Sequence, residues 1–358
     1  MSVRYGILAA VLFGISAPLS KLLLDGVDPL PLAALLYLGA GASLGLLLAI
    51  GRAFRLANTE ARLERRDLPW LLGAILAGGV AGPILLLLGL QQTPAATASL
   101  LLNAEVVATG LVALAIFRES VGRQVWAAIA AVAVGGALLS VDPSTGWGIS
   151  SGAILILAAC LAWGFDNNFT ARISLKDPKR IVAIKGLAAG GFSLLLTLGL
   201  GRPLPALRHA LYALLLGAVS YGASIALFVQ SLRRVGAART GALFGMAPFV
   251  GVALSLLVFR ALPQWTFFLA LPLMVAAVVL LSREKHEHAH AHVNLAHTHR
   301  HRHDDAHHDH VHADRVVASV SHAHEHAHAD HVHSHTHQPD PHHRHEHDTT
   351  DRSLPGSG

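Results

Sequence analysis

Apolar runs separated by short polar links fill residues 1–282, whereas residues 283–358 are almost entirely polar. A helix that spans a bilayer needs roughly 20 predominantly apolar residues. Measured against that length, the chain divides into segments near residues 3–24, 30–50, 69–90, 94–117, 121–140, 149–170, 181–200, 206–230, 238–259 and 264–281. The pattern therefore predicts an all-α polytopic membrane protein with ten transmembrane helices and a polar tail.

The links between these segments carry the residues of tight turns, as in 25–29 (DGVDP), 91–94 (QQTP) and 142–146 (DPSTG). Such short links make neighbouring helices antiparallel. The first run could also be a cleaved signal peptide, since Arg4 precedes it and small residues follow. A spanning helix is the better interpretation, because the run is long enough to cross a bilayer and has a counterpart later in the chain.

An internal repeat relates the two parts of the apolar region, because residues 90–119 align without gaps with residues 232–261. The matches include Leu90 with Leu232, Phe117-Arg118 with Phe259-Arg260, and the aromatic-Gly pairs Phe13-Gly14 and Trp163-Gly164. This repeat pairs predicted helices 1 and 6, and 4 and 9. Since each half has an odd number of helices, the halves must be inverted in the membrane, as in many secondary transporters.

Basic residues in the links predict the orientation, because cytoplasmic links carry the excess of Lys and Arg. If the N-terminus is cytoplasmic, seventeen such residues lie in cytoplasmic links and ends, and three, Arg202, Arg208 and Arg260, lie in external links. We therefore predict that both termini are cytoplasmic.

Composition limits the class of protein. The chain is 53% hydrophobic and 14% charged, whereas soluble domains have about 25% charged residues. Its basic residues form short clusters between apolar runs, so we expect no nucleic-acid partner. The single cysteine, Cys160, excludes a disulfide framework and a cysteine-based zinc site. No phosphate-binding loop ending in Lys-Ser/Thr is present, so we expect neither ATP-driven coupling on this chain nor an enzyme.

Four segments of the apolar region carry motifs: FGISAPLSK at 13–21, AWGFDNNFTAR at 162–172, the run 95–119 that ends in FRE, and GAARTGALFGMAPFVGVALSLLVF at 236–259. By their order along the chain, and by their repetition in two halves that each open with an aromatic-Gly pair, they resemble the drug/metabolite transporter superfamily and, within it, the EamA-like permeases. The resemblance covers about residues 3–282.

The resemblance implies two inverted five-helix repeats, at residues 1–142 and 143–283, followed by a tail at 284–358. It also implies a secondary transporter of a small metabolite, amino acid or drug-like compound, usually an exporter, in a bacterial-type inner membrane. Two positions depart from the family pattern. Glu105-Val106 stands where such proteins often have a proline, and Ala261 replaces an acidic residue after the ninth helix.

Glu105 is the main candidate for chemistry, because it lies at the midpoint of the fourth predicted helix. A bare carboxylate there costs a few kcal/mol, so such residues face the bundle interior and often serve function. Glu105 could bind a cationic substrate group, or take up a proton that is exchanged for substrate. Alternatively, it is protonated and only hydrogen-bonded to a neighbouring helix.

Other polar residues in the apolar runs are weaker candidates. Asn103 lies about 200° around the helix from Glu105, so one of the two packs elsewhere. Asp166, Asn167 and Asn168 lie near the cytoplasmic end of the sixth helix, where they either line a cavity mouth or cap the helix. Lys21 ends the first helix and either snorkels to the interface or, as the resemblance implies, acts in gating or anion contact.

Two prolines lie inside predicted helices, Pro18 in the first and Pro248 in the ninth. Each removes a backbone donor and favours a kink, which lipid tolerates only where the freed carbonyl faces protein or a cavity. We predict that both positions act as hinges.

The tail is rich in histidine, because residues 286–347 hold 24 of the 25 histidines. Such a segment cannot bury a core, so we expect disorder. Imidazoles with interspersed carboxylates suit Zn, Ni, Co and Cu. Alternatives are a pH-responsive tail and a low-complexity expansion without a role. The histidines that we expect to bind metal are His286, His288, His290, His292, His297, His299, His301, His303, His322, His324, His326, His328, His331, His333, His335 and His337.

The leading hypothesis is a proton- or gradient-driven permease whose tail senses or buffers divalent metal, with no cofactor required in the membrane domain. A rival makes Zn, Ni or Co the cargo, although Glu105 and Asp166 are a thin ligand set for it. A third hypothesis is a membrane-anchored metal store or sensor that transports nothing. The expected partners are the lipid bilayer, a small-molecule substrate and divalent metal ions, and the sequence leaves a homodimer open.

Overall fold

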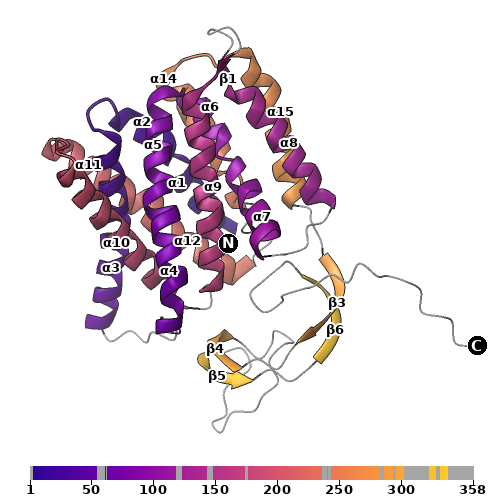
Figure 1. Ribbon diagram of the computed structural model, residues 1–358. Helices are drawn as coiled ribbons and strands as arrows, with labels where there is room; N and C mark the ends of the chain where they lie inside the picture. The colour runs from indigo at the N-terminus through magenta and orange to yellow at the C-terminus, as the bar shows by residue number, and fades with distance from the viewer. Residues whose placement is uncertain are drawn as a thin grey trace, which may run out of the picture.

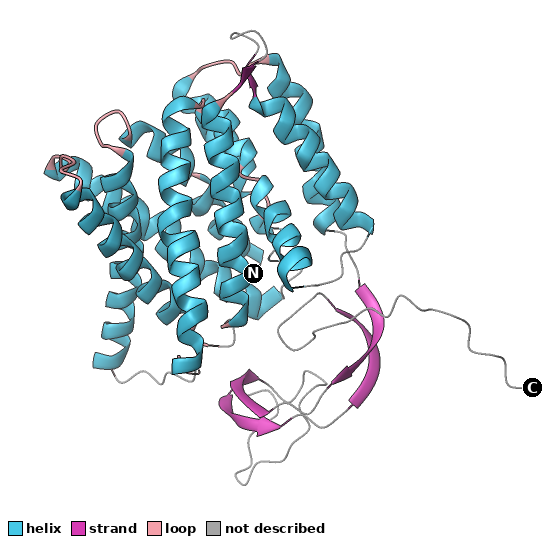
Figure 2. Ribbon diagram, viewed as in Figure 1, coloured by secondary structure: helices cyan, strands magenta, loops and turns pink. Residues whose placement is uncertain are grey.

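The computed structural model describes residues 3–54, 61, 63–117, 123–142, 148–173, 176–235, 240, 243–282, 286–292, 296–301, 322–327 and 331–337. Most of the described chain forms a bundle of helices that stand side by side, and the tail lies beyond one end of the bundle (Figure 1). Apart from one short pair, β1 (Val141–Asp142) with β2 (Gly148–Ile149), the described bundle residues contain no strand (Figure 2).

The first half of the bundle contains α1 (Val3–Gly14), α2 (Ser16–Leu23), α3 (Pro29–Ala53), a short 3-10 turn (Arg65–Asp67), α4 (Leu68–Ala74), a π-helical segment (Ile75–Ala81), α5 (Gly82–Gln92), α6 (Ala95–Leu101), α7 (Ala104–Phe117) and α8 (Arg123–Ser140). The second half contains α9 (Ser151–Arg172), α10 (Pro178–Gly199), α11 (Leu207–Leu216), a second π-helical segment (Gly217–Ala223), α12 (Ser224–Val235), α14 (Ala247–Phe259) and α15 (Trp265–Ser282).

Seven helical rods in the described residues have the length and hydropathy to cross a membrane: Val3–Leu23, Pro29–Ala53, Arg65–Gln92, Ala95–Ile116, Ser151–Arg172, Pro178–Gly199 and Leu207–Ser231. Three shorter apolar helices are Trp126–Ser140, Ala247–Phe259 and Trp265–Leu280. The prediction of an all-α membrane protein is confirmed, with seven of the ten predicted spans at full length. The total of ten crossings stays a prediction.

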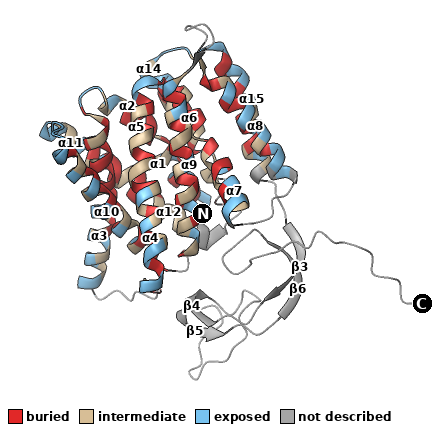
Figure 3. Cartoon of the chain, in the orientation of Figure 1, coloured by how far each residue is buried: buried red, intermediate tan, exposed pale blue. Residues whose placement is uncertain are grey.

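Buried and exposed residues alternate along the helices of the bundle (Figure 3), and many of the exposed residues have large apolar side chains. Leu195 is 70% exposed and Leu257 is 73% exposed, whereas Leu87 and Ile156 are fully buried. Soluble monomers rarely expose such extensive apolar surface. The exposed leucines are therefore the side chains that contact lipid tails.

Helix packing follows the same plan in both halves. Across the bundle, α3 packs against α10, α6 against α14, and α8 against α15. The helix α9 packs on α5 and α7 of the first half, and α1 packs on α12 and α14 of the second half. Each half thus places its first helix against the other half, in agreement with the predicted equivalence of helices 1 and 6, and of 4 and 9.

Irregular turns also recur in both halves. The π-helical segments Ile75–Ala81 and Gly217–Ala223 are 142 residues apart, the same shift that aligns residues 90–119 with 232–261. The rod of α6 and α7 is broken at residues 102–103, and a turn at 245–246 precedes α14. Discontinuous helices of this kind form binding sites in many secondary transporters.

The tail differs from the predicted disorder in four described segments. Strand β3 (His286–His292) pairs antiparallel with β6 (His331–His337), and β4 (Ala296–His301) pairs antiparallel with β5 (His322–Ala327). The cause is the two-residue alternation of histidine with other residues, which is the period of a strand. Predicted ligands His303 and His328 lie outside the described residues.

Candidate functional site

Glu105 lies in the first turn of α7, directly after the break in the α6–α7 rod. Asn103 forms the break: its Nδ2 donates to the backbone oxygen of Leu100 at 2.9 Å, and its side chain is buried. The two residues therefore face different surroundings, as their spacing predicted. Asn103 stabilises the end of α6, whereas the carboxylate of Glu105 points toward α9.

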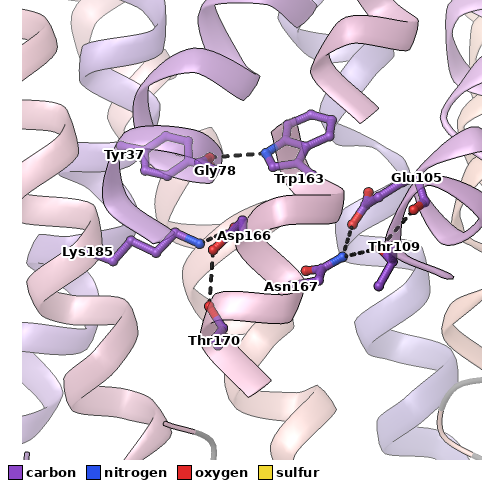
Figure 4. A network of polar contacts seen from close by, with 9 residues as sticks. All are labelled: Tyr37, Gly78, Glu105, Thr109, Trp163, Asp166, Asn167, Thr170 and Lys185. Carbon is purple, nitrogen blue, oxygen red and sulfur yellow. Dashed lines mark hydrogen bonds and ion pairs between the residues drawn. The ribbon is translucent and has the colours of Figure 1, made fainter. Parts of the chain in front are cut away.

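Only neutral groups contact the Glu105 side chain in the described part of the chain. Asn167 Nδ2 on α9 donates to Glu105 Oε1 at 3.0 Å and to Thr109 Oγ1 at 3.0 Å (Figure 4). Thr109 Oγ1 donates in turn to the backbone oxygen of Glu105 at 2.8 Å. Glu105 is half-buried, and a carboxylate can accept hydrogen bonds from more than one donor.

Asp166, one residue before Asn167, is held differently. Its Oδ2 forms an ion pair with Lys185 Nζ on α10, and its Oδ1 accepts a hydrogen bond from Thr170 Oγ1 at 3.1 Å (Figure 4). The side chains of Asp166 and Lys185 are only 8% and 16% exposed. Because each charge is compensated, this buried pair joins α9 to α10. Glu105 differs, because it forms no ion pair in the described part of the chain.

Gly78, in the first π-helical segment, connects the two sides of the site. Its carbonyl oxygen accepts hydrogen bonds from Tyr37 Oη at 2.6 Å and from Trp163 Nε1 at 3.1 Å (Figure 4). In a π-helix this carbonyl would pair with the amide five residues later, but that residue is Pro83, which has no N–H. Tyr37 and Trp163 therefore satisfy an acceptor that the helix cannot.

The close approach of α9 requires a glycine at position 78. A Cβ atom built there would overlap the carboxylate of Asp166. The absence of a side chain lets α9 approach close enough for Asp166 to reach Lys185.

The remaining predicted residues hold helices together. Asn168 Nδ2 donates to the backbone oxygens of Thr109 at 3.0 Å and Gly164 at 2.8 Å, which fixes α9 to α7. Lys21 Nζ donates to the backbone oxygens of Leu90 and Gln91 at the end of α5. Lysine at a helix C-terminus is favourable, because it pairs with free carbonyls and the helix dipole.

Both predicted hinge prolines lie beside helix irregularities. Pro18 follows the interruption at Ile15 between α1 and α2, and Pro248 follows the turn at 245–246. Each lacks the amide that would close the preceding turn. Their role as hinges stays a prediction.

Sequence reasoning missed Lys185, Tyr37, Trp163 and Thr109. Lys185 carries the same signal as Glu105, an ionisable side chain inside an apolar helix, and that rule would have found it. The sequence gives no signal for Tyr37, Trp163 and Thr109, because these residue types are common in membrane helices. They are recognised as part of the site only by their contacts with the Gly78 carbonyl and with Asn167.

A charged cluster joins the two halves at the end of the bundle that carries the α3–α4 link. Lys176 Nζ lies 2.5 Å from Glu64 Oε1 and 3.6 Å from Asp67 Oδ2. The hydrogen bond from Lys176 is the main cause that lowers the pKa of Glu64 below its ordinary value. The amide of Asp177 also donates to the backbone oxygen of Ala61 at 3.0 Å. These contacts hold the segment before α4 against the segment before α10.

Comparison with known proteins places the chain in a family. The model of the EamA-like transporter family matches residues 1–141 and 150–283. An uncharacterized transporter of Methanothermobacter thermautotrophicus is 32% identical over 270 residues, which cover 71% of this chain and 78% of that protein. A solved crystal structure shares the fold, with a TM-score of 0.57 at 20% identity over 79% of this chain and 97% of that chain.

The family match covers both halves of the helical bundle and therefore includes Glu105, Asp166 and Lys185. The chain is similar in sequence to a transporter and has helices that suit a membrane. It belongs to the EamA-like transporter family.

Proposed function

We propose that this protein is a secondary-active exporter that exchanges protons for a small compound with a positively charged amine, such as an amino acid, a related metabolite or a drug-like amine. The observation that supports this most strongly is Glu105, a half-buried carboxylate inside the membrane that accepts a hydrogen bond from the Asn167 amide and forms no ion pair among the described residues. A substrate ammonium group would supply the missing cation.

Exchange follows from competition for one carboxylate. When Glu105 carries a proton it is neutral and cannot form an ion pair, and when it binds an amine the proton has left. Neither state leaves an uncompensated charge within the bilayer, where such a charge is costly. Asn167 orients the carboxylate in both states, because Asn167 Nδ2 holds Oε1 and leaves Oε2 available.

Alternating access would use the irregular helices. The interruptions at Ile15, at 102–103 and at 245–246 lie in α1–α2, α6–α7 and the segment before α14, which pack against one another. Rocking of two inverted halves about such interruptions exposes a central site to each side in turn. With both termini in the cytoplasm, the inward proton gradient of a bacterial-type inner membrane would drive the compound outward.

Proteoliposomes that contain the full-length protein and a pH-sensitive dye test this proposal. A panel of amines, amino acids and uncharged analogues is added, and substrate-dependent proton movement is recorded. We expect amines to move protons and uncharged analogues not to. Glu105→Gln should abolish substrate-dependent proton movement, because an amide takes up no proton. It should also weaken amine binding roughly 10- to 100-fold, because a charge-assisted hydrogen bond is worth about 1.5–3 kcal/mol.

The matched control is Asp28→Asn, the same chemical change in an exposed link whose carboxylate lies 4.0 Å from Arg202. It should leave transport unchanged. Transport by Glu105→Gln at the normal rate and with an unchanged pH dependence would show that Glu105 neither binds substrate nor carries protons.

The proposal includes a divalent-metal-binding role for the tail. The Cα register of β3 and β6 sets histidine opposite histidine at His286 and His337, His288 and His335, His290 and His333, and His292 and His331. This backbone register repeats histidine on both strands at every second position, which supports metal binding by the paired segments. Zn, Ni, Co and Cu suit such ligands.

Calorimetric titration of the full chain with ZnCl₂ and NiCl₂ should show several bound ions, which a chain truncated after residue 285 should lose. Transport by the two chains is then compared with and without metal. If truncation altered neither metal binding nor the response of transport to metal, the tail would have no such role.

Metal as cargo is the alternative function. It would have to use carboxylates inside the bundle, and there Asp166 is already paired with Lys185. In the described residues, no group of three His, Cys, Asp or Glu side chains forms a metal site. Uptake of radiolabelled zinc, nickel and cobalt in the same proteoliposomes distinguishes this alternative from amine transport.

A further inference from the structure

A groove of about 320 Å³ runs between α3 and α10, away from the site at Glu105. Its lining includes Gly45, Leu48 and Ile184, and two arginines, Arg52 and Arg180, stand at one end. Figure 1 places α3 and α10 on the opposite side of the bundle from α7. The groove is therefore a separate feature of the fold.

Glycines explain why the groove exists. At the helix crossing, a Cβ atom on Gly41 would overlap the backbone of Leu187, and one on Gly186 would overlap the backbone of Gly41. One turn further along α3, a Cβ atom on Gly45 would meet nothing within 4 Å. The helices touch at Gly41 and leave open space at Gly45.

The groove opens on the surface that faces lipid. Near it on α3, Leu46 is 62% exposed and Leu47 is 54% exposed, and Ile184 on α10 is 43% exposed. Such apolar side chains at a bundle surface contact hydrocarbon tails in a bilayer. In a bilayer, lipid acyl chains would therefore lie next to the groove.

The two arginines lie at the level of lipid headgroups. Arg52 is in the last turn of α3 and Arg180 in the first turn of α10. The helix α3 has 25 residues. It is therefore about 37 Å long, longer than the hydrocarbon core of about 30 Å. Its ends reach the polar region of the bilayer.

Both arginines have hydrogen-bond donors that can still bind an anion. In the described part of the chain, no carboxylate forms an ion pair with Arg52. Arg180 Nε lies 3.4 Å from Asp177 Oδ2, which occupies one of the five donors of the guanidinium group. Guanidinium groups bind phosphate in a bidentate manner.

We infer that the α3–α10 groove binds an anionic phospholipid, with the phosphate held between Arg52 and Arg180 and one acyl chain lying along Gly45, Leu48 and Ile184. Basic pockets between transmembrane helices recognise anionic headgroups in this way. The lipid would fill the open space beside the helix crossing and join the ends of α3 and α10. This site is independent of the proposed transport function.

Native mass spectrometry of the full-length protein in mild detergent tests the inference. Phosphatidylglycerol and phosphatidylcholine with identical acyl chains are titrated separately, and inorganic phosphate forms a third arm. We expect phosphatidylglycerol to bind more tightly than phosphatidylcholine. Arg52→Gln should weaken its binding about fivefold, and the double variant with Arg180→Gln about 25-fold, since each basic residue contributes about 1 kcal/mol to binding of anionic lipid.

A second variant tests the groove without changing charge. Gly45→Leu should fill the open space and weaken phosphatidylglycerol binding at least fivefold, although both arginines remain. The matched controls are Gly191→Leu, a position on α10 where a Cβ atom also meets nothing within 4 Å, and Arg66→Gln, an exposed arginine near the same end of the bundle. Both controls should bind lipid normally.

Three results would overturn the inference. They are equal binding of phosphatidylglycerol and phosphatidylcholine, normal phosphatidylglycerol binding by both the double arginine variant and Gly45→Leu, and binding of inorganic phosphate alone as tight as that of the lipid. The last result would assign the arginines to a free anion.

Discussion

Replacing Lys185 by methionine should lower the free energy of unfolding by about 3–5 kcal/mol, because it leaves the buried carboxylate of Asp166 without its cation. The side chain of Asp166 is only 8% exposed, and its remaining described partner is the hydroxyl of Thr170. Methionine keeps the length and apolar stem of lysine, so the loss would measure the missing charge rather than a cavity.

The double variant Asp166→Asn with Lys185→Met should recover most of this stability. Asparagine still accepts a hydrogen bond from Thr170 and carries no charge. Replacing both members of a buried pair is often neutral, whereas removing one is strongly destabilising. The measurement is an unfolding titration of the purified variants in mixed micelles.

Lys179→Met is the matched control, since Lys179 is exposed on the same helix. It should change stability by less than about 0.5 kcal/mol, as surface substitutions usually do. A Lys185→Met variant as stable as this control, or a double variant no more stable than the single one, would contradict the importance of the ion pair.

Replacing Gly39 by valine should destabilise the bundle by at least about 3 kcal/mol, the upper range for overpacking. A Cβ atom on Gly39 would overlap the backbone carbonyl of Leu214 in α11. Backbone atoms cannot move aside by a change of rotamer, so α3 and α11 would have to separate. The reciprocal contact, Gly217 against the carbonyl of Leu36, would then open as well.

Gly191→Val separates this effect from the properties of valine itself, because a Cβ atom at Gly191 meets nothing within 4 Å. The control should fold with nearly normal stability in the same unfolding titration. Equal stability of Gly39→Val and Gly191→Val would mean that the close approach of α3 and α11 is not required for folding.

The sequence predicted the helical spans well, because hydrocarbon thickness sets a length that apolar runs must match. The predicted segment 30–50 became Pro29–Ala53, and 149–170 became Ser151–Arg172. The helix ends moved where prolines and caps act, as at Asp177, whose carboxylate accepts from the amides of Lys179 and Arg180 at the start of α10.

The candidate site was only partly predictable. Hydropathy identifies Glu105 as an unusual residue, and the structure places Asn167 beside it. No pattern in one sequence tells that Asp166 would reach Lys185, because that contact depends on the crossing of α9 and α10 and on the missing side chain of Gly78. Periodicity reports which residues share a helix face, but not which helices become neighbours.

In the tail, composition and periodicity predict different structures. Composition predicted disorder because the segment has too few apolar residues for a core. The two-residue alternation of histidine in β3 and β6 was visible in the sequence, and alternation is also the pattern of a strand. At these described positions the structure follows the periodicity, and disorder in the rest of the tail stays a prediction.

The π-helical segments Ile75–Ala81 and Gly217–Ala223 limit where residues can be inserted into or deleted from the chain. One residue added or removed after either π-helical segment would rotate the rest of that helix by about 100° about its axis. In the first rod this would carry Leu86, Leu87 and Leu90 out of the core and toward the bilayer. Insertions and deletions should therefore be confined to the links.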